Sequence, residues 1–260
     1  MKSVLLSLIF IIITFSACQP THYIPNMSNV PILQEKGEAS VSVGISTAGR
    51  DSASQYSLQT AYLLTNHFAL QTNSVIYRFN EDFTRNRTRN SGQIHEFGLG
   101  YITNFEDKRF NLAIWGIIGG GNMNTILLRQ NERLSTDLRL YGIDPTISIV
   151  TEYHSLSFSM KSFLLEYSNI RGNLDYNSVN EVEYLRNNDT AFIIEPTLTE
   201  KIGFKRFKFI LQTTYSGNLM FRYRDNSILD KGHDRQVNIL VSFGLSYNFY
   251  TRKKKTPVEF

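Results

Sequence analysis

The alternating stretch VNILVSFGLSYNFY, residues 237–250, decides the fold. Every second side chain from Val237 to Phe249 is apolar, and the side chains between them are small or polar apart from Leu240. Successive side chains of a β-strand point to opposite faces, so this stretch is a strand with one apolar and one polar face. Residues 207–216, the preceding predicted strand, repeat the pattern.

Eight earlier segments have the same two-residue period, and no segment shows helical periodicity of useful length. They are residues 38–46, 55–64, 68–78, 93–104, 109–120, 138–151, 155–168 and 191–201. Within 155–168 the apolar side chains change phase after Met160, which predicts a β-bulge near Lys161. The sequence therefore predicts about ten antiparallel strands.

The connections between these segments are sorted by length. Tight turns fall at 65–67, 104–108, 152–154 and 202–206, and long polar loops at 79–92, 121–137, 169–190 and 218–235. Only the first loop, 47–54, is short. Short periplasmic turns and long outer loops are typical of an all-β, up-and-down transmembrane β-barrel.

The alternative is a soluble, calycin-like barrel whose apolar face surrounds a ligand. The residues between the apolar positions argue against it, because small and hydrogen-bonding side chains suit a crowded polar lumen. They include Ser40, Ser42, Gln59, Gln71, Asn73, Thr146, Ser148, Thr197 and Gln212. The chain is 42% hydrophobic with a mean hydropathy of −0.22, as expected when apolar residues alternate instead of forming runs.

Aromatic side chains near the strand ends predict two girdles at the membrane interfaces. Phe68, Tyr101, Phe110, Phe207 and Phe249 lie beside the tight turns, and Tyr56, Tyr77, Tyr167 and Tyr215 beside the long loops.

The N-terminus has the features of a secretory signal. Lys2 precedes an apolar run from Val4 to Phe15, which is too short for a comfortable membrane span. The run ends before Cys18, the only cysteine of the chain. We expect a signal peptide over 1–17 and acylation of Cys18; the alternative is an ordinary signal peptide with an incidental cysteine.

Residues 18–37 are expected to form a lipidated, Pro-rich tether, because proline breaks strands and helices. The barrel is predicted over 38–250, and 251–260 form a basic C-terminal tail.

Several motifs resemble those of Bacteroidota-type outer-membrane β-barrel lipoproteins. They are Tyr23-Ile24-Pro25-Asn26, Asn29-Val30-Pro31-Ile32-Leu33, Glu35-Lys36-Gly37-Glu38 and the terminal Tyr247-Asn248-Phe249-Tyr250, which is similar to the signal read by barrel-assembly machinery. The basic tail after this strand departs from the pattern. The resemblance implies an outer-membrane location and a barrel fold, and it carries no catalytic residue over.

An even strand number with a periplasmic N-terminus places both barrel ends on the periplasmic side and the long loops outside. No acidic pair follows Cys18, as surface export of such lipoproteins usually requires, so the expected lipid anchor lies on the periplasmic side.

Two groups of charged residues are candidate sites. A salt-bridged lumen network is expected from Glu96, Asp144, Glu195 and Lys208, with Lys161 and Lys201 as further partners. Contacts with lipopolysaccharide phosphates are expected from Arg85, Arg87, Arg89, Arg222 and Arg224 in the outer loops, although a merely solvated surface is the alternative.

We predict no catalytic residues, metal or cofactor. His233-Asp234 with Glu81-Asp82 resembles the arrangement of ten-stranded surface proteases, but the flanking residues do not match. The leading hypothesis is a structural or partner-binding barrel of the cell envelope. The alternatives are a narrow channel or transporter for small solutes and, third, a surface hydrolase. Expected partners are outer-membrane lipid, lipopolysaccharide, barrel-assembly machinery and other envelope proteins, and no nucleic acid.

Overall fold

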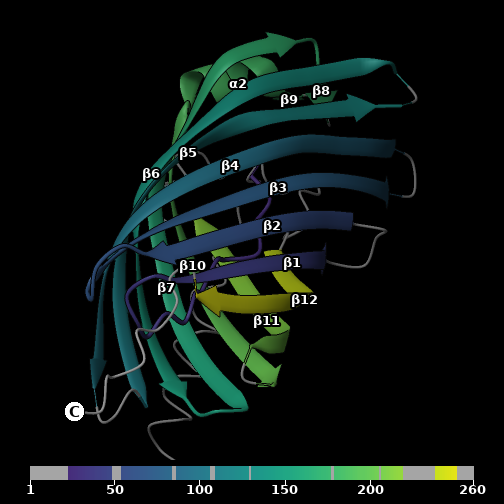
Figure 1. Cartoon of the computed structure of the whole chain (residues 1–260). Helices are drawn as coiled ribbons and strands as arrows, with labels where there is room; N and C mark the ends of the chain where they lie inside the picture. The colour runs from purple at the N-terminus through teal and green to yellow at the C-terminus, as the bar shows by residue number, and fades with distance from the viewer. Residues whose placement is uncertain are drawn as a thin grey trace, which may run out of the picture.

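The computed structural model describes residues 23–48, 54–83, 86–105, 109–128, 130–176, 179–204, 206–218 and 238–250. Ten antiparallel strands close into a barrel in the order β1-β12-β11-β10-β7-β6-β5-β4-β3-β2 (Figure 1). The barrel strands are β1 (Glu38–Ala48), β2 (Ser54–Leu63), β3 (Phe68–Phe83), β4 (Asn86–Phe105), β5 (Phe110–Leu127), β6 (Glu132–Val150), β7 (His154–Gly172), β10 (Thr190–Gly203), β11 (Phe207–Asn218) and β12 (Asn238–Tyr250). The predicted ten-stranded barrel is confirmed.

The outer face of the barrel is apolar, as the alternation predicts. Large hydrophobic side chains are exposed around the whole circumference, among them Val43, Leu58, Ile76, Phe97, Leu99, Ile114, Ile147, Phe158, Leu198, Phe209 and Phe243. Such a surface would be unfavourable in water and is what a barrel presents to lipid, where closure also satisfies every strand's backbone groups. The fold is therefore that of a transmembrane β-barrel.

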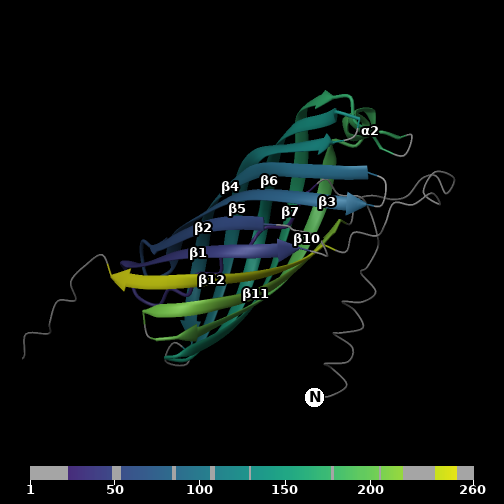
Figure 2. The same cartoon turned by 90° about the vertical axis from the view of Figure 1, so that its right-hand side faces the viewer.

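The barrel is taller on one side than on the other. β1, β2, β11 and β12 have 10–13 residues, close to the 9–11 that cross a bilayer, and form what we call the low wall. β4 to β7 have 18–20 residues and form the high wall, which continues beyond the membrane on the side of the predicted long loops. Figure 2 shows the slanted rim that results.

Two of the predicted loops are therefore mostly strand. The expected loops 79–92 and 121–137 are taken up by the extended ends of β3 with β4 and of β5 with β6. Cross-strand pairing continues to Phe83–Asn86 and to Leu127–Glu132. These polar, Asn-rich segments lacked a clean alternation, which is why the sequence pattern alone did not predict strands there.

The segment 169–190 also contains structure that the sequence analysis missed. After β7 it forms a small hairpin of β8 (Asp175–Tyr176) and β9 (Val179–Asn180), followed by the helix α2 (Glu181–Asn187). Asn180 caps the helix, since its side chain accepts a hydrogen bond from the Glu183 backbone N–H at 3.1 Å. Seven residues are too few to show helical periodicity. Among the described residues, no helix is long and apolar enough to span a membrane.

The expected bulge near Lys161 is wrong. β7 keeps one register with β10 past this point, and its inward side chains run without a break from Ser155 to Tyr167. The phase changed in the sequence because the barrel interior itself changes from polar to apolar at Phe163. The one register shift between β6 and β7 that the described residues show lies between Ser135 and Asp137.

The upper interior, on the loop side, is an apolar layer. α2 contributes Val182 and Leu185 to it, β3 contributes Tyr77 and Phe79, and the high wall contributes Ile94, Met123, Leu138, Leu140, Phe163, Leu165 and Tyr167. Tyr77 and Tyr167 were predicted to belong to the loop-side girdle; that assignment is wrong, because both are buried inside the barrel. The turn-side girdle is better matched, with Phe68 and Tyr101 exposed on the outer face.

The segment before β1 lies inside the barrel. Residues 23–33 have no helix or strand, as expected from their prolines, but Tyr23, Met27 and Leu33 are at most 1% exposed. The sequence predicted an extended tether but not its location, and the structure places residues 23–33 of it inside the barrel. We call residues 23–33 the lumen segment; they form the purple trace within the barrel in Figure 1.

Candidate functional site in the barrel lumen

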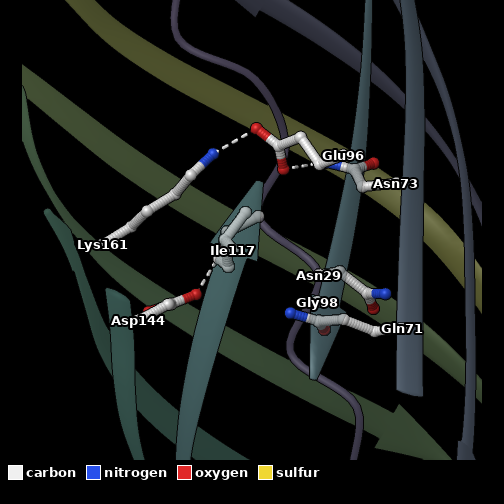
Figure 3. A pocket seen from close by; sticks show the side chains of 9 residues that line it. Asn29, Gln71, Asn73, Glu96, Gly98, Ile117, Asp144 and Lys161 are labelled. Atoms are coloured by element: carbon white, nitrogen blue, oxygen red, sulfur yellow. Dashed lines mark hydrogen bonds and ion pairs between the residues drawn. The ribbon is translucent and has the colours of Figure 1, made fainter. Parts of the chain in front are cut away.

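A buried lysine lies near the centre of the lumen. Lys161 projects inward from β7, and its ammonium forms an ion pair with Glu96 of β4 and lies 3.9 Å from a carboxylate oxygen of Glu195 on β10. All three side chains are less than a tenth exposed, so each charge depends on the others for stability. Figure 3 shows Lys161 and Glu96 facing each other across the lumen.

Amide groups complete this network. Asn26 and Asn73 each donate a side-chain hydrogen bond to Glu96, at 3.0 and 3.3 Å. Asp144, which faces the same small cavity, accepts a hydrogen bond from the Ser28 hydroxyl at 3.4 Å. The lumen segment therefore supplies two polar partners to the carboxylates around Lys161: Asn26 donates to Glu96, and Ser28 donates to Asp144.

The three predicted carboxylates lie together, and of the three predicted lysines it is Lys161, and not Lys208, that pairs with them. Glu96, Asp144 and Glu195 all lie around Lys161, whereas Lys208 is the second residue of β11, half-buried at the turn-side rim. Lys201 is buried, but it donates to the Val30 carbonyl at 2.7 Å instead of joining the carboxylates. Alternation shows which side chains point inward, but their height in the barrel depends on strand tilt and register.

Inward side chains bind the backbone of the lumen segment along its length. Amide groups donate to its carbonyls: Gln55 to Pro25, Gln59 and Asn73 to Met27, Gln212 to Ser28, Asn248 to Ile32 and Asn111 to Leu33, at 2.9–3.5 Å. Gln212 also accepts from the Ser28 backbone N–H at 2.8 Å. An extended chain buried without strand partners needs such bonds, because unpaired backbone groups are costly.

Glycines in the wall make room for large interior side chains. A Cβ atom on Gly44 of β1 would lie 2.3 Å from the sulfur of Met27, and one on Gly100 of β4 would lie 2.3 Å from the Trp115 ring. Met27 also accepts a hydrogen bond from Ser57 at 3.2 Å. The wall is thus shaped to the lumen segment, and little space is left between them.

A small cavity of about 10 Å³, roughly room for one water molecule, lies beside the lumen segment. Its lining includes Ser28, Asn29, Gln71, Asp144 and Lys161 (Figure 3). A strip of buried hydroxyls on β6 and β7 has no protein hydrogen-bond partner: Thr146, Ser148, Ser155 and Ser157. This strip runs towards the turn-side rim.

Most of the other predicted site residues lie outside the part that the structure describes. These are Cys18, Arg85, Arg222, Arg224 and the His233-Asp234 pair. Arg87 lies in β4, where only its backbone is described, and Arg89 is half-buried in the same strand. The lipidation and loop-contact assignments therefore stay predictions.

The described histidines lie on the outer face or in turns. His154 contacts Glu200 at 2.9 Å, His95 contacts Ser74 at 3.1 Å, and His67 stacks on Tyr101. In the described ranges, no three His, Cys, Asp or Glu side chains are grouped as a metal site.

No protein-family model matches the chain, and a search of the curated proteins finds no match. Three solved structures with a similar arrangement show low sequence identity to this chain. The translocator domain of autotransporter NalP from Neisseria meningitidis has a TM-score of 0.44 and 9% identity, covering 82% of this chain and 87% of that one. The COG4313 outer membrane channel from Pseudomonas putida F1 has a TM-score of 0.39 and 10% identity, covering 85% and 100%. The NanC porin has a TM-score of 0.30 and 9% identity, covering 82% and 100%.

Proposed function

We propose that the chain is an outer-membrane barrel lipoprotein with a structural or partner-binding role in the cell envelope and a closed lumen. The observation that carries the proposal is the lumen segment, whose backbone is hydrogen-bonded to inward side chains from the Pro25 carbonyl to that of Leu33. A barrel of this size encloses little space even before a polypeptide occupies it. The apolar outer face supports a membrane location, and we assign the barrel no enzymatic role.

Bilayer conductance tests the closed lumen. The purified barrel should give little or no steady conductance in a planar bilayer. Glu195→Gln should lower thermal stability more than it raises conductance, because Lys161 then loses one of its two nearby carboxylates. Sustained openings of the wild type, with an ion selectivity that shifts in Glu195→Gln, would contradict the proposal.

A narrow channel is the second candidate function. It is favoured by the strip of unpartnered hydroxyls on β6 and β7 and the cavity beside Asp144, which together make a polar path part of the way through the barrel. The apolar layer and α2 close that path on the loop side. The conductance measurement above decides between the two functions.

The proposal includes contact between the outer loops and lipopolysaccharide. Arg222 and Arg224 lie in the loop after β11, and arginine suits phosphate geometry. Replacing both by Gln should weaken retention on lipopolysaccharide about three- to tenfold at low salt, with a smaller effect at high salt. The matched control is Arg109→Gln with Arg206→Gln, two exposed arginines on the turn side. Equal losses in both pairs would indicate a general charge effect and no loop site.

A further inference from the structure

The lumen segment has a definite direction through the barrel. It joins β1 at the turn-side rim, where Glu38 pairs with Tyr250, the last residue of β12. Leu33 bonds to Asn111, the second residue of β5 and therefore also near this rim. From there to Pro25 the chain moves steadily away from the turns.

At its other end the segment reaches the loop-side rim of the low wall. The Pro25 carbonyl accepts from Gln55, which is the second residue of β2 counted from the loop side. Tyr23 packs edge-on against Phe163, with ring centroids 5.4 Å apart, at the lower boundary of the apolar layer. The low wall ends at this height, whereas the high wall continues past it.

Chain length limits where the preceding residues can go. In a mature chain that begins at the proposed lipidation site, Cys18 stands five positions before Tyr23, and five fully extended steps span at most about 18 Å. β1 has 11 residues, so the way back along the wall is about 36 Å. The preceding residues are therefore too few to return to the turn-side rim.

We propose that the chain before Tyr23 leaves the barrel at the loop-side rim above the low wall, so that the mature N-terminus is displayed on the outer surface. The lipid proposed for Cys18 then belongs in the outer leaflet, contrary to the periplasmic anchor expected from the sequence. The barrel carries its own N-terminal segment across the membrane, and the lumen side chains that bind main-chain groups hold it there. The assignment of this rim to the cell exterior rests on the proposed outer-membrane function.

Thiol labelling of intact cells tests this topology with the full-length chain. A membrane-impermeant maleimide is applied to cells producing Thr21→Cys. Asn131→Cys, in the exposed turn between β5 and β6, marks the loop side, and Asn66→Cys, in the exposed turn between β2 and β3, marks the turn side. The wild-type chain measures any labelling of Cys18 itself.

Thr21→Cys should be labelled in intact cells to within about twofold of Asn131→Cys, while Asn66→Cys stays at background until the outer membrane is permeabilised. Labelling of Thr21→Cys only after permeabilisation, or only after unfolding, would overturn the proposal. If Asn66→Cys is labelled in intact cells and Asn131→Cys is not, the proposed orientation fails. The side on which the N-terminus lies is then still decided by whether Thr21→Cys is labelled under the same conditions as Asn131→Cys or as Asn66→Cys. Labelling of Cys18 in the wild type on intact cells would support display of the N-terminus on the outer surface and would contradict acylation of Cys18.

Discussion

At the residue scale, the fit between Gly44 and Met27 holds the lumen segment against the wall. The Met27 sulfur occupies the place where any larger residue at position 44 would put its Cβ atom. Gly244, the partner of Gly44 across β1 and β12, contacts the same methionine from the neighbouring strand, since its own Cβ would lie 3.2 Å from the Met27 methyl group. Two paired glycines thus form the recess that receives one side chain.

A double-mutant cycle tests this contact. Gly44→Ala should destabilise the wild type by about 1 kcal/mol and should cost clearly less in a Met27→Ala background, where the Ser57 hydroxyl, 2.8 Å from the new Cβ, is the close contact left. The measurement is urea unfolding of the barrel in lipid vesicles. Gly116→Ala is the control, because its Cβ would meet nothing closer than 3.9 Å. Additive effects of Gly44→Ala and Met27→Ala would show that the two positions are not in contact.

The central charges show what sequence can and cannot predict at this scale. Alternation correctly placed Glu96, Asp144 and Glu195 inside, because side-chain direction along a strand depends only on the two-residue period. It could not choose among the lysines, because Lys161 and Lys208 both lie on inward faces but at different heights. The lumen segment was missed for a related reason: proline-rich sequence predicts an extended chain, and only the barrel's side chains show that it is enclosed.

At the scale of the single strand, the two-residue period survives while the chemistry of the inner face changes. β7 carries Ser155, Ser157 and Ser159 inward near the turns, then Phe163 and Leu165 further up. The outer face of the same strand is apolar near the turns, with Leu156, Phe158 and Met160, and carries Ser162 and Glu166 further up, so the apolar side chains change from the outer to the inner face along the strand. The sequence pattern therefore predicted all ten barrel strands, but it misread this change as a bulge and did not detect the hairpin of β8 and β9 or the two turns of α2.

The outer face can be tested with a matched pair of phenylalanines. Phe243 lies in the middle of β12 and Phe105 at the turn-side end of β4, and the two are 54% and 53% exposed. Phe243→Arg should destabilise the folded barrel by about 2–4 kcal/mol, because arginine is costly at the bilayer midplane, whereas Phe105→Arg should cost about 0–1 kcal/mol. Unfolding in lipid vesicles measures both. Equal stabilities for the two variants would contradict the assignment of this face to lipid.

At the scale of the whole molecule, three features occupy the interior of the barrel. The lumen segment fills the lower interior, the Lys161 network joins that segment to the walls, and the apolar layer with α2 covers the high wall on the loop side. Among the described residues, this layer does not extend over the low wall, where the lumen segment reaches the loop-side rim.

In the structure, the chain's own N-terminal segment fills the lumen. The rate at which a thiol at position 27 reacts with maleimide measures this directly. Met27→Cys in the folded, purified barrel should react with maleimide about 100-fold or more slowly than Asn66→Cys, because reaction requires local opening of the lumen. Both should react at the same rate in urea, with the wild type as background. A Met27→Cys thiol that reacts as fast as Asn66→Cys in the folded barrel would show that the segment lies outside the lumen and would contradict the closed lumen.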